Sequence, residues 1–135
     1  GNRRATAFVP VDGSSANELA QTAALASLAD PTPEGVSIVE LAAAEGASID
    51  REMKGEIVPF SAQTRMSGLD LPGGTQVRKG ASSAIIAWLE ADGGRLPSSV
   101  LAELDEHAAH ISQSGGTPLV VAERSAQNGD RILGI

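Results

Sequence analysis

Hydrophobic residues recur at helical spacing in four segments of this chain, and Gly or Pro marks most of their ends. The segments are residues 15–29, a stretch from Pro33 to near Gly46, the residues around Ile85, Trp88 and Leu89, and a stretch starting near Ser98. Apolar side chains at i, i+3 and i+4 indicate amphipathic helices. Thr32 stands where an N-cap belongs, with Pro33 at the first helical position. The pattern therefore predicts four helices.

Shorter apolar runs between turn residues predict strands. They cover residues 5–11, 56–61, 67–71, 75–79, 117–124 and 131–135. The resulting order is one strand, two helices, three strands, two helices and two strands, so hairpins dominate and helices come in pairs. This order predicts an α+β fold with an antiparallel sheet and helices packed on it. A chain of 135 residues suits a single domain with one core.

Charge and composition exclude several classes of function. The net charge is −7 and the pI is about 4.7, with no basic stripe, so the sequence predicts no nucleic-acid binding. Cysteine is absent, which excludes disulfides and thiolate metal sites. His107 and His110 are spaced i, i+3, but two histidines without a third ligand are better explained as surface residues, and no metal site is expected. No segment is long and apolar enough to span a bilayer.

The two ends of the sequence suggest a piece of a larger protein. The chain starts at Gly1 and stops within the apolar run Ile132–Ile135. Natural termini are usually polar and frayed. We therefore expect residues 1–135 to be one domain excised from a longer chain.

The segment 67–79 allows an argument about strand register. A three-residue loop over Pro72–Gly74 places Leu69 opposite Val77, which sets an apolar residue against an apolar one. A two-residue loop would oppose Leu69 and Arg78 instead. The first register is preferred, and it places Ser67 beside Lys79 at the open end of the hairpin, with Phe60 returning there on the preceding strand. Gly68 and Gly80 are expected to leave the backbone bare for a flat ligand.

This combination of groups suits an adenine ring. A purine stacks on an aromatic face, for which Phe60 is the candidate, and it accepts a cation such as Lys79. Its exocyclic amine donates to a carboxylate, which Asp30 or Glu34 could supply. Structural roles remain open for each residue: Phe60 as core, Lys79 as a solvated charge at the end of a strand, and the two acids as capping groups around Pro33.

Several runs of residues resemble one known family. They are Ala26–Asp30, Thr32–Gly35, Pro59–Gly68, Arg78–Gly80 and Thr117–Val121, and they resemble the nucleotide-binding subunit of the Kdp potassium-transporting P-type ATPases. The likeness extends over essentially the whole chain, and Gly1–Arg3 looks like the segment just after the family's phosphorylated-aspartate motif. The resemblance implies the nucleotide-binding (N) domain, a twisted antiparallel sheet flanked by helix pairs.

The resemblance also implies the residues that contact ATP, with Phe60 and Lys79 on either side of the adenine. Carried over by position, the contacts are Asp30, Glu34, Phe60, Ser61, Ala62, Gln63, Thr64, Arg65, Met66, Ser67, Lys79 and Gly80. No catalytic and no metal-binding residues are implied within the chain. The motif D-K-T-G-T and the magnesium-binding aspartates of the family are absent from the sequence, so the domain alone is expected to bind ATP without hydrolysing it.

In a parent pump of this family, the domain would present the γ-phosphate of ATP to an aspartate of the neighbouring P domain, where Mg²⁺ is held. The implied partners are the P and actuator domains of the same chain and the other subunits of a potassium-uptake complex. The implied location is the cytoplasmic side of a bacterial plasma membrane, and the isolated domain is expected to be a monomer. The alternative is a non-enzymatic protein-interaction domain. An independent hydrolase would need a nucleophile or metal site that the sequence does not offer.

Overall fold

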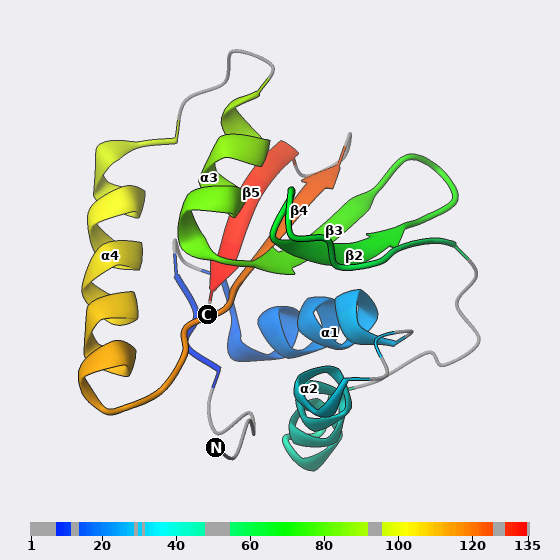
Figure 1. Ribbon diagram of the computed structural model, residues 1–135, viewed down its shortest axis with the longest axis horizontal. Helices are drawn as coiled ribbons and strands as arrows, with labels where there is room; N and C mark the ends of the chain where they lie inside the picture. The colour runs from blue at the N-terminus through cyan, green and yellow to red at the C-terminus, as the bar shows by residue number, and fades with distance from the viewer. Residues whose placement is uncertain are drawn as a thin grey trace.

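A computed structural model describes residues 8–11, 14–28, 30, 32–47, 55–91, 96–125 and 129–134. Its five strands form one antiparallel sheet in which each strand pairs with its neighbours along the chain (Figure 1). They are β1 (Glu56–Val58), β2 (Met66–Asp70), β3 (Gln76–Gly80), β4 (Val120–Ser125) and β5 (Gly129–Gly134). The predicted α+β class and antiparallel sheet are confirmed.

The β2–β3 hairpin has the register that the apolar pairing predicted. Leu69 lies opposite Val77, and Ser67 lies opposite Lys79. In the connecting turn, Gly73 and Gly74 have φ angles of 93° and 94°, which residues with a Cβ rarely adopt. The three-residue loop over Pro72–Gly74 is therefore possible because glycine occupies these two positions.

In one helix pair, α1 (Ala16–Ser27) lies across one face of the sheet and α2 (Pro33–Ala44) packs against α1. The Ser15 hydroxyl and the Glu18 carboxylate form a capping box at the start of α1, and Thr32 caps α2 as predicted. Small residues of α1 allow close approach on two sides: Ala23 and Ala26 pack in clusters with strand residues, and Ala20 and Ala24 pack against Ala42 of α2. Ala26 packs on Leu69 and Val77 of the hairpin.

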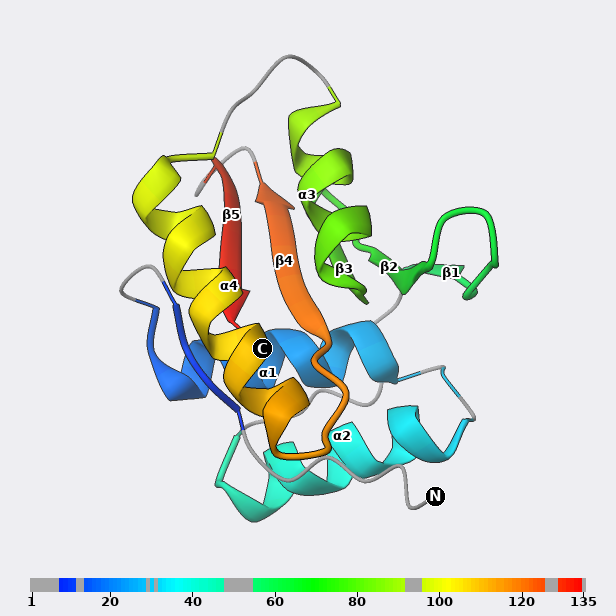
Figure 2. The same cartoon turned by 60° about the vertical axis from the view of Figure 1, so that its left-hand side comes forward.

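The second pair, α3 (Ser82–Glu90) and α4 (Ser98–Gln113), is inserted between β3 and β4 and packs on the other face (Figure 2). The largest cluster of buried apolar side chains lies here, and its members are Val11, Ile85, Leu89, Val100, Leu104, Val120, Ala122 and Ile132. The sheet therefore has a core on each side, and strand residues alternate between the two.

Of the strand predicted over residues 5–11, the described residues 8–11 form one bridge. Residues 5–7 lie outside the described part of the chain, and Pro10 forms an isolated antiparallel bridge with Gly134. Proline has no N–H to donate to a β-ladder, which explains why the pairing does not extend through this residue. The segment still contributes to packing, because Val11 is 1 % exposed. Among the described residues, no helix is both long and apolar enough to cross a membrane.

The packing of α4 predicts unequal costs for two leucines on that helix. Leu104 is 1 % exposed, whereas Leu101 is only half-buried. We expect Leu104→Ala to lower the free energy of unfolding by about 2–5 kcal/mol, because it leaves a cavity in the larger core. Leu101→Ala, the matched control, should cost less than about half as much. Urea denaturation measures both, and equal losses would contradict this description of α4.

Candidate functional site

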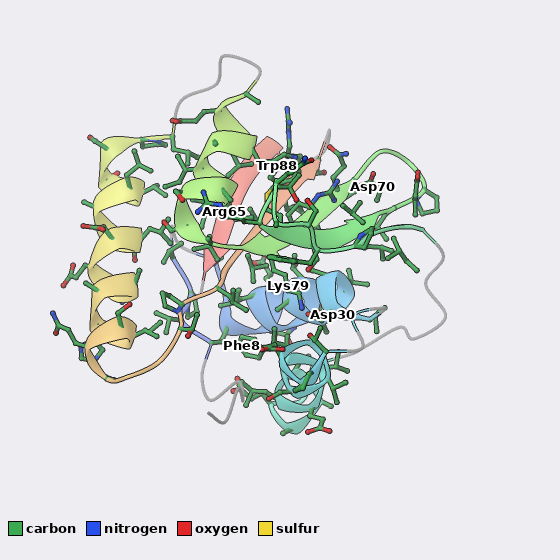
Figure 3. All side chains as sticks on the ribbon, in the orientation of Figure 1. Phe8, Asp30, Arg65, Asp70, Lys79 and Trp88 are labelled. Carbon is green, nitrogen blue, oxygen red and sulfur yellow. The ribbon has the colours of Figure 1, made fainter. Side chains whose placement is uncertain are left out.

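The two faces of the β2–β3 hairpin carry different groups. Ser67, Leu69, Val77 and Lys79 point toward the α1–α2 pair, while their sequence neighbours point toward α3. Figure 3 shows Lys79 and Asp30 on the α1–α2 side of the sheet, and Arg65, Asp70 and Trp88 on the α3 side. The predicted neighbours Ser67 and Lys79 are thus side by side on the face that α1 and α2 cover.

Lys79 forms a short ion pair with Asp30. Its Nζ lies 2.6 Å from Asp30 Oδ2, and the two side chains are 4 % and 17 % exposed. The interpretation of Lys79 as a solvated charge at the end of a strand is wrong, because its side chain is buried and β3 lies between β2 and β4 in the sheet. The pair joins the centre of the sheet to the turn between α1 and α2.

Asp30 is also bonded within that turn. Its Oδ1 accepts hydrogen bonds from the Thr32 N–H at 3.0 Å and the Thr32 hydroxyl at 2.6 Å. Thr32 Oγ1 in turn accepts from the Gly35 N–H at 3.2 Å, which caps α2. A Cβ at Gly35 would lie 2.5 Å from Asp30 Cγ, so only glycine leaves room for the carboxyl group. Asp30 therefore supports the cap of α2 through Thr32 and also pairs with Lys79.

These contacts change the acidity of Asp30. Burial by itself raises the pKa of the carboxyl, but hydrogen bonds from Lys79 and Thr32 and the charge of the Lys79 ammonium outweigh it and hold the pKa below its ordinary value. The carboxylate is therefore charged near neutral pH and available as an acceptor.

Phe60 lies in the loop between β1 and β2, and its side chain is 65 % exposed. The interpretation of Phe60 as a core residue is therefore wrong. The loop after it closes in a turn: Arg65 N–H donates to the Ser61 carbonyl at 2.7 Å, and the Ser61 and Thr64 hydroxyls are 2.9 Å apart. Ala62 and Gln63 are exposed at the tip of the turn. An exposed aromatic ring thus sits on an ordered loop.

Three of the residues expected to contact ATP do not share the face of Lys79. Met66 packs against the core under α3 and α4, and Arg65 Nη2 donates to Ser83 Oγ in α3 at 3.0 Å. A Cβ at Gly80 would lie only 2.4 Å from the Arg65 carbonyl oxygen, so Gly80 faces the neighbouring strand and not an open surface. The prediction that Gly68 and Gly80 leave a bare surface beside Lys79 is wrong, because alternate strand residues face opposite sides and the neighbouring strand fills that space.

Two further predicted residues are Ser67 and Glu34. Ser67 is 7 % exposed and lies opposite Lys79 in the register, and Glu34 is half-buried in the first turn of α2.

His107 and His110 lie on α4, where His107 Nε2 is 3.9 Å from Glu103 Oε2. Within the described part of the chain, no three His, Asp or Glu side chains converge to hold a metal ion.

Sequence reasoning missed the direct contact between Asp30 and Lys79, and also a charged cluster on the α3 side. Arg78 Nη1 lies 2.7 Å from Asp70 Oδ1, and the Arg78 and Arg124 guanidinium groups lie 5.2 and 5.5 Å from the Trp88 ring centre. The Trp88 ring stacks on the buried Arg78 guanidinium, and its π face attracts the positive charge. Alternation along β2 and β3 was the available signal, since Asp70 and Arg78 belong to the same face.

Sequence comparison finds close relatives of known name. The chain is 49 % identical over 135 residues, all of its length, to the potassium-transporting ATPase ATP-binding subunit of Deinococcus radiodurans. It is 47 % identical over 124 residues, 90 % of its length, to the protein of the same name from Bacillus cereus. No protein-family model matches the chain. These identities establish homology with a segment of those subunits.

Structure comparison shows the fold of this segment. It matches the N-domain of a copper-transporting P-type ATPase with a TM-score of 0.63, covering 96 % of both chains at 16 % identity. The chain is thus homologous to a segment of the potassium-transporting ATPase ATP-binding subunits and has the fold of a P-type ATPase N-domain. It spans only 17–18 % of the length of the potassium-transporting relatives it matches.

The lowered pKa of Asp30 predicts how the stability of the domain depends on pH. A carboxyl with a lowered pKa stabilises the fold fully above its ordinary value of 3.8, and this contribution is lost as the pH falls through the lower folded-state pKa. Asp30→Asn should therefore flatten the fall of the urea midpoint below about pH 4. At pH 7 the variant should be less stable by more than about 1 kcal/mol, because Lys79 loses its charged partner.

The midpoints are measured by urea denaturation of both proteins between pH 7 and pH 2.5. If Asp30→Asn loses stability with acid as steeply as the parent protein does, the contribution assigned to the Asp30–Lys79 pair is refuted.

Proposed function

We propose that this N domain binds ATP by its adenine ring, on the side of the sheet where Asp30 and Lys79 form their ion pair. The observation that carries the proposal is the Phe60 side chain, which is 65 % exposed on an ordered loop. An exposed aromatic ring has little value for stability, whereas stacking of a base on it contributes about 1–3 kcal/mol to binding. The name of the relatives, ATP-binding subunit, supports the same ligand.

The polar groups of the Asp30–Lys79 pair suit the edge of an adenine. Asp30 Oδ2 accepts one hydrogen bond, from Lys79, and retains a lone pair for the exocyclic amine of the base. The Lys79 ammonium has three donors, so it can bond to Asp30 and still face the purine. Ser67 and Glu34 are proposed as further polar contacts to ATP. The loop residues that are proposed to line the site are Ser61, Ala62, Gln63 and Thr64. Met66 and Gly80 support the loop from the other face.

We further propose that the domain works as part of a larger P-type ATPase, where it presents the γ-phosphate of ATP to an aspartate of the P domain. The ion moved would be potassium, on the basis of the relatives' name. Mg²⁺ would be held with the phosphates outside this domain, and the domain would face the cytoplasm of a bacterium and contact the actuator domain and other subunits during the cycle. Since the sequence contains no D-K-T-G-T motif, the domain alone should bind ATP without hydrolysing it.

A titration with ATP tests the adenine site. We expect a dissociation constant on the order of 0.1–1 mM, because one stacked base and a few hydrogen bonds offset only part of the association entropy. Phe60→Ala should weaken binding at least about tenfold, because it removes the stacking ring. The matched control is Ile57→Ala, since Ile57 is an apolar side chain of similar exposure, 54 %, on the adjoining strand. Amide shifts in NMR spectra measure both constants.

The same spectra separate this proposal from its alternative. Shifts around Phe60, Ser67 and Lys79 that saturate with ATP support the proposal. No shift at millimolar ATP would leave the non-enzymatic interaction domain as the better description, and equal losses in Phe60→Ala and Ile57→Ala would refute stacking on Phe60.

Removal of magnesium is the second test. Because the proposed contacts involve the base and the metal belongs to the phosphates, ATP affinity with EDTA should stay within about twofold of its value with Mg²⁺. The comparison is made on the isolated domain by calorimetry, with ADP as the control for a shorter phosphate chain. A loss of binding on chelation would show that the phosphates and metal are held within this domain.

A further inference from the structure

The loop that carries Phe60 ends at a residue in a costly conformation. Arg65 has a φ of +56°, and it is the one non-glycine residue with positive φ in the described part of the chain. The left-handed region costs an arginine about 1–2 kcal/mol, and Gly or Asn would fit better. Its guanidinium also approaches the first turn of α3, where the helix dipole disfavours a positive charge. Two unfavourable features at one residue suggest that its side chain has a use.

The Arg65 side chain links the loop to a helix. Nη2 donates to the Ser83 hydroxyl at 3.0 Å, and Ser83 lies in the first turn of α3, 18 residues further along the chain. Figure 3 shows Arg65 on the α3 side of the sheet, opposite to Lys79 and Asp30. The guanidinium is therefore directed away from the proposed adenine site and toward α3.

The backbone of Arg65 is fixed as well. Its N–H closes the turn on the Ser61 carbonyl at 2.7 Å, and its carbonyl oxygen occupies the space where a Cβ at Gly80 would lie, 2.4 Å from that position. Between Ser61 and Arg65 the loop is thus held at both ends, and Phe60 directly precedes it. Because β1 has only three residues at the edge of the sheet, this anchor determines much of where the ring stands.

We propose that Arg65 is a positioning residue: its contact with Ser83 fixes the loop so that the exposed Phe60 ring is ready to stack on a base, and it makes no contact with the nucleotide itself. This proposal rests on the proposed function, because it assigns a role in the same site. It reassigns Arg65 from the ATP contact that the family resemblance implied to an anchor on the opposite face. Pre-ordering of the loop lowers the entropy lost on binding.

Two single variants test the anchor from its two ends. Arg65→Asn removes the guanidinium but tolerates the positive φ, and Ser83→Ala removes the hydroxyl acceptor. Each should raise the dissociation constant for ATP about three- to tenfold, the range expected for one hydrogen bond. The double variant should bind ATP no more weakly than either single variant. Ser83→Thr should bind ATP like the parent protein, because threonine keeps the hydroxyl. The urea midpoint should not fall in either variant, since both side chains are exposed and Asn relieves the cost of the positive φ at position 65.

A second cycle asks whether Arg65 acts through the ring. In the Phe60→Ala background, Arg65→Asn should have no further effect on ATP binding, because the ring that it positions is gone. In nucleotide-free protein, the amide signals of residues 60–64 should shift toward random-coil positions in both Arg65→Asn and Ser83→Ala. These spectra report the loop and do not depend on ATP.

The outcomes distinguish the two proposals. If Phe60→Ala binds ATP as well as the parent protein, the proposed function is wrong. If Phe60→Ala weakens binding but Arg65→Asn and Ser83→Ala do not, the positioning role is overturned while the function stands. If Arg65→Asn weakens binding and Ser83→Ala leaves it unchanged, Arg65 contacts the phosphates directly and the positioning role is equally overturned.

Discussion

The partly buried ion pair between Lys79 and Asp30 is the contact on which the arrangement of this domain depends. It connects a residue of a central strand to one that lies 49 positions earlier, in the turn between α1 and α2. Such a pair adds little net stability over apolar packing, but it is costly to break, because either charge would be left buried alone. Its effect is therefore to fix one docking of the helix pair on the sheet. Gly35 and Thr32 serve the same end, since they give the carboxyl group its place.

The two faces of the sheet carry different groups of residues. One face packs on the alanine-rich α1 and holds Ser67 and Lys79, while the other carries the larger apolar core under α3 and α4. Arg78 and Asp70 pair on that second face beside Trp88. Adjacent residues of one strand thus support different functions because their side chains alternate. A change in strand register by one residue would exchange these groups, which explains why the apolar pairing of Leu69 with Val77 matters to the site as well as to the fold.

Local signals in the sequence were sufficient for the elements and for the hairpin. Thr32 and Pro33 marked the start of α2, and the match of Leu69 with Val77 gave the register. Long-range relations were not available in this way: nothing local tells that Asp30 reaches Lys79 or that Arg65 reaches Ser83. The error over Gly68 and Gly80 was avoidable, because alternation already placed their missing side chains on the face away from Lys79. Pro10 shows a different limit, where one missing N–H restricts the pairing of the described residues 8–11 to a single bridge.

The position of Phe60 follows from a compromise at the edge of the sheet. A ring that must meet a ligand has to be exposed, and an exposed ring receives no support from a core. Strand β1 is short and pairs on one side only, so it cannot hold the loop alone (Figure 2). Support must then come from polar contacts that leave the ring free, and the Ser61–Thr64 turn and the reach of Arg65 to α3 are contacts of that kind. The strained φ of Arg65 is understandable on these terms, because the geometry that aims its side chain at α3 also closes the turn behind the ring.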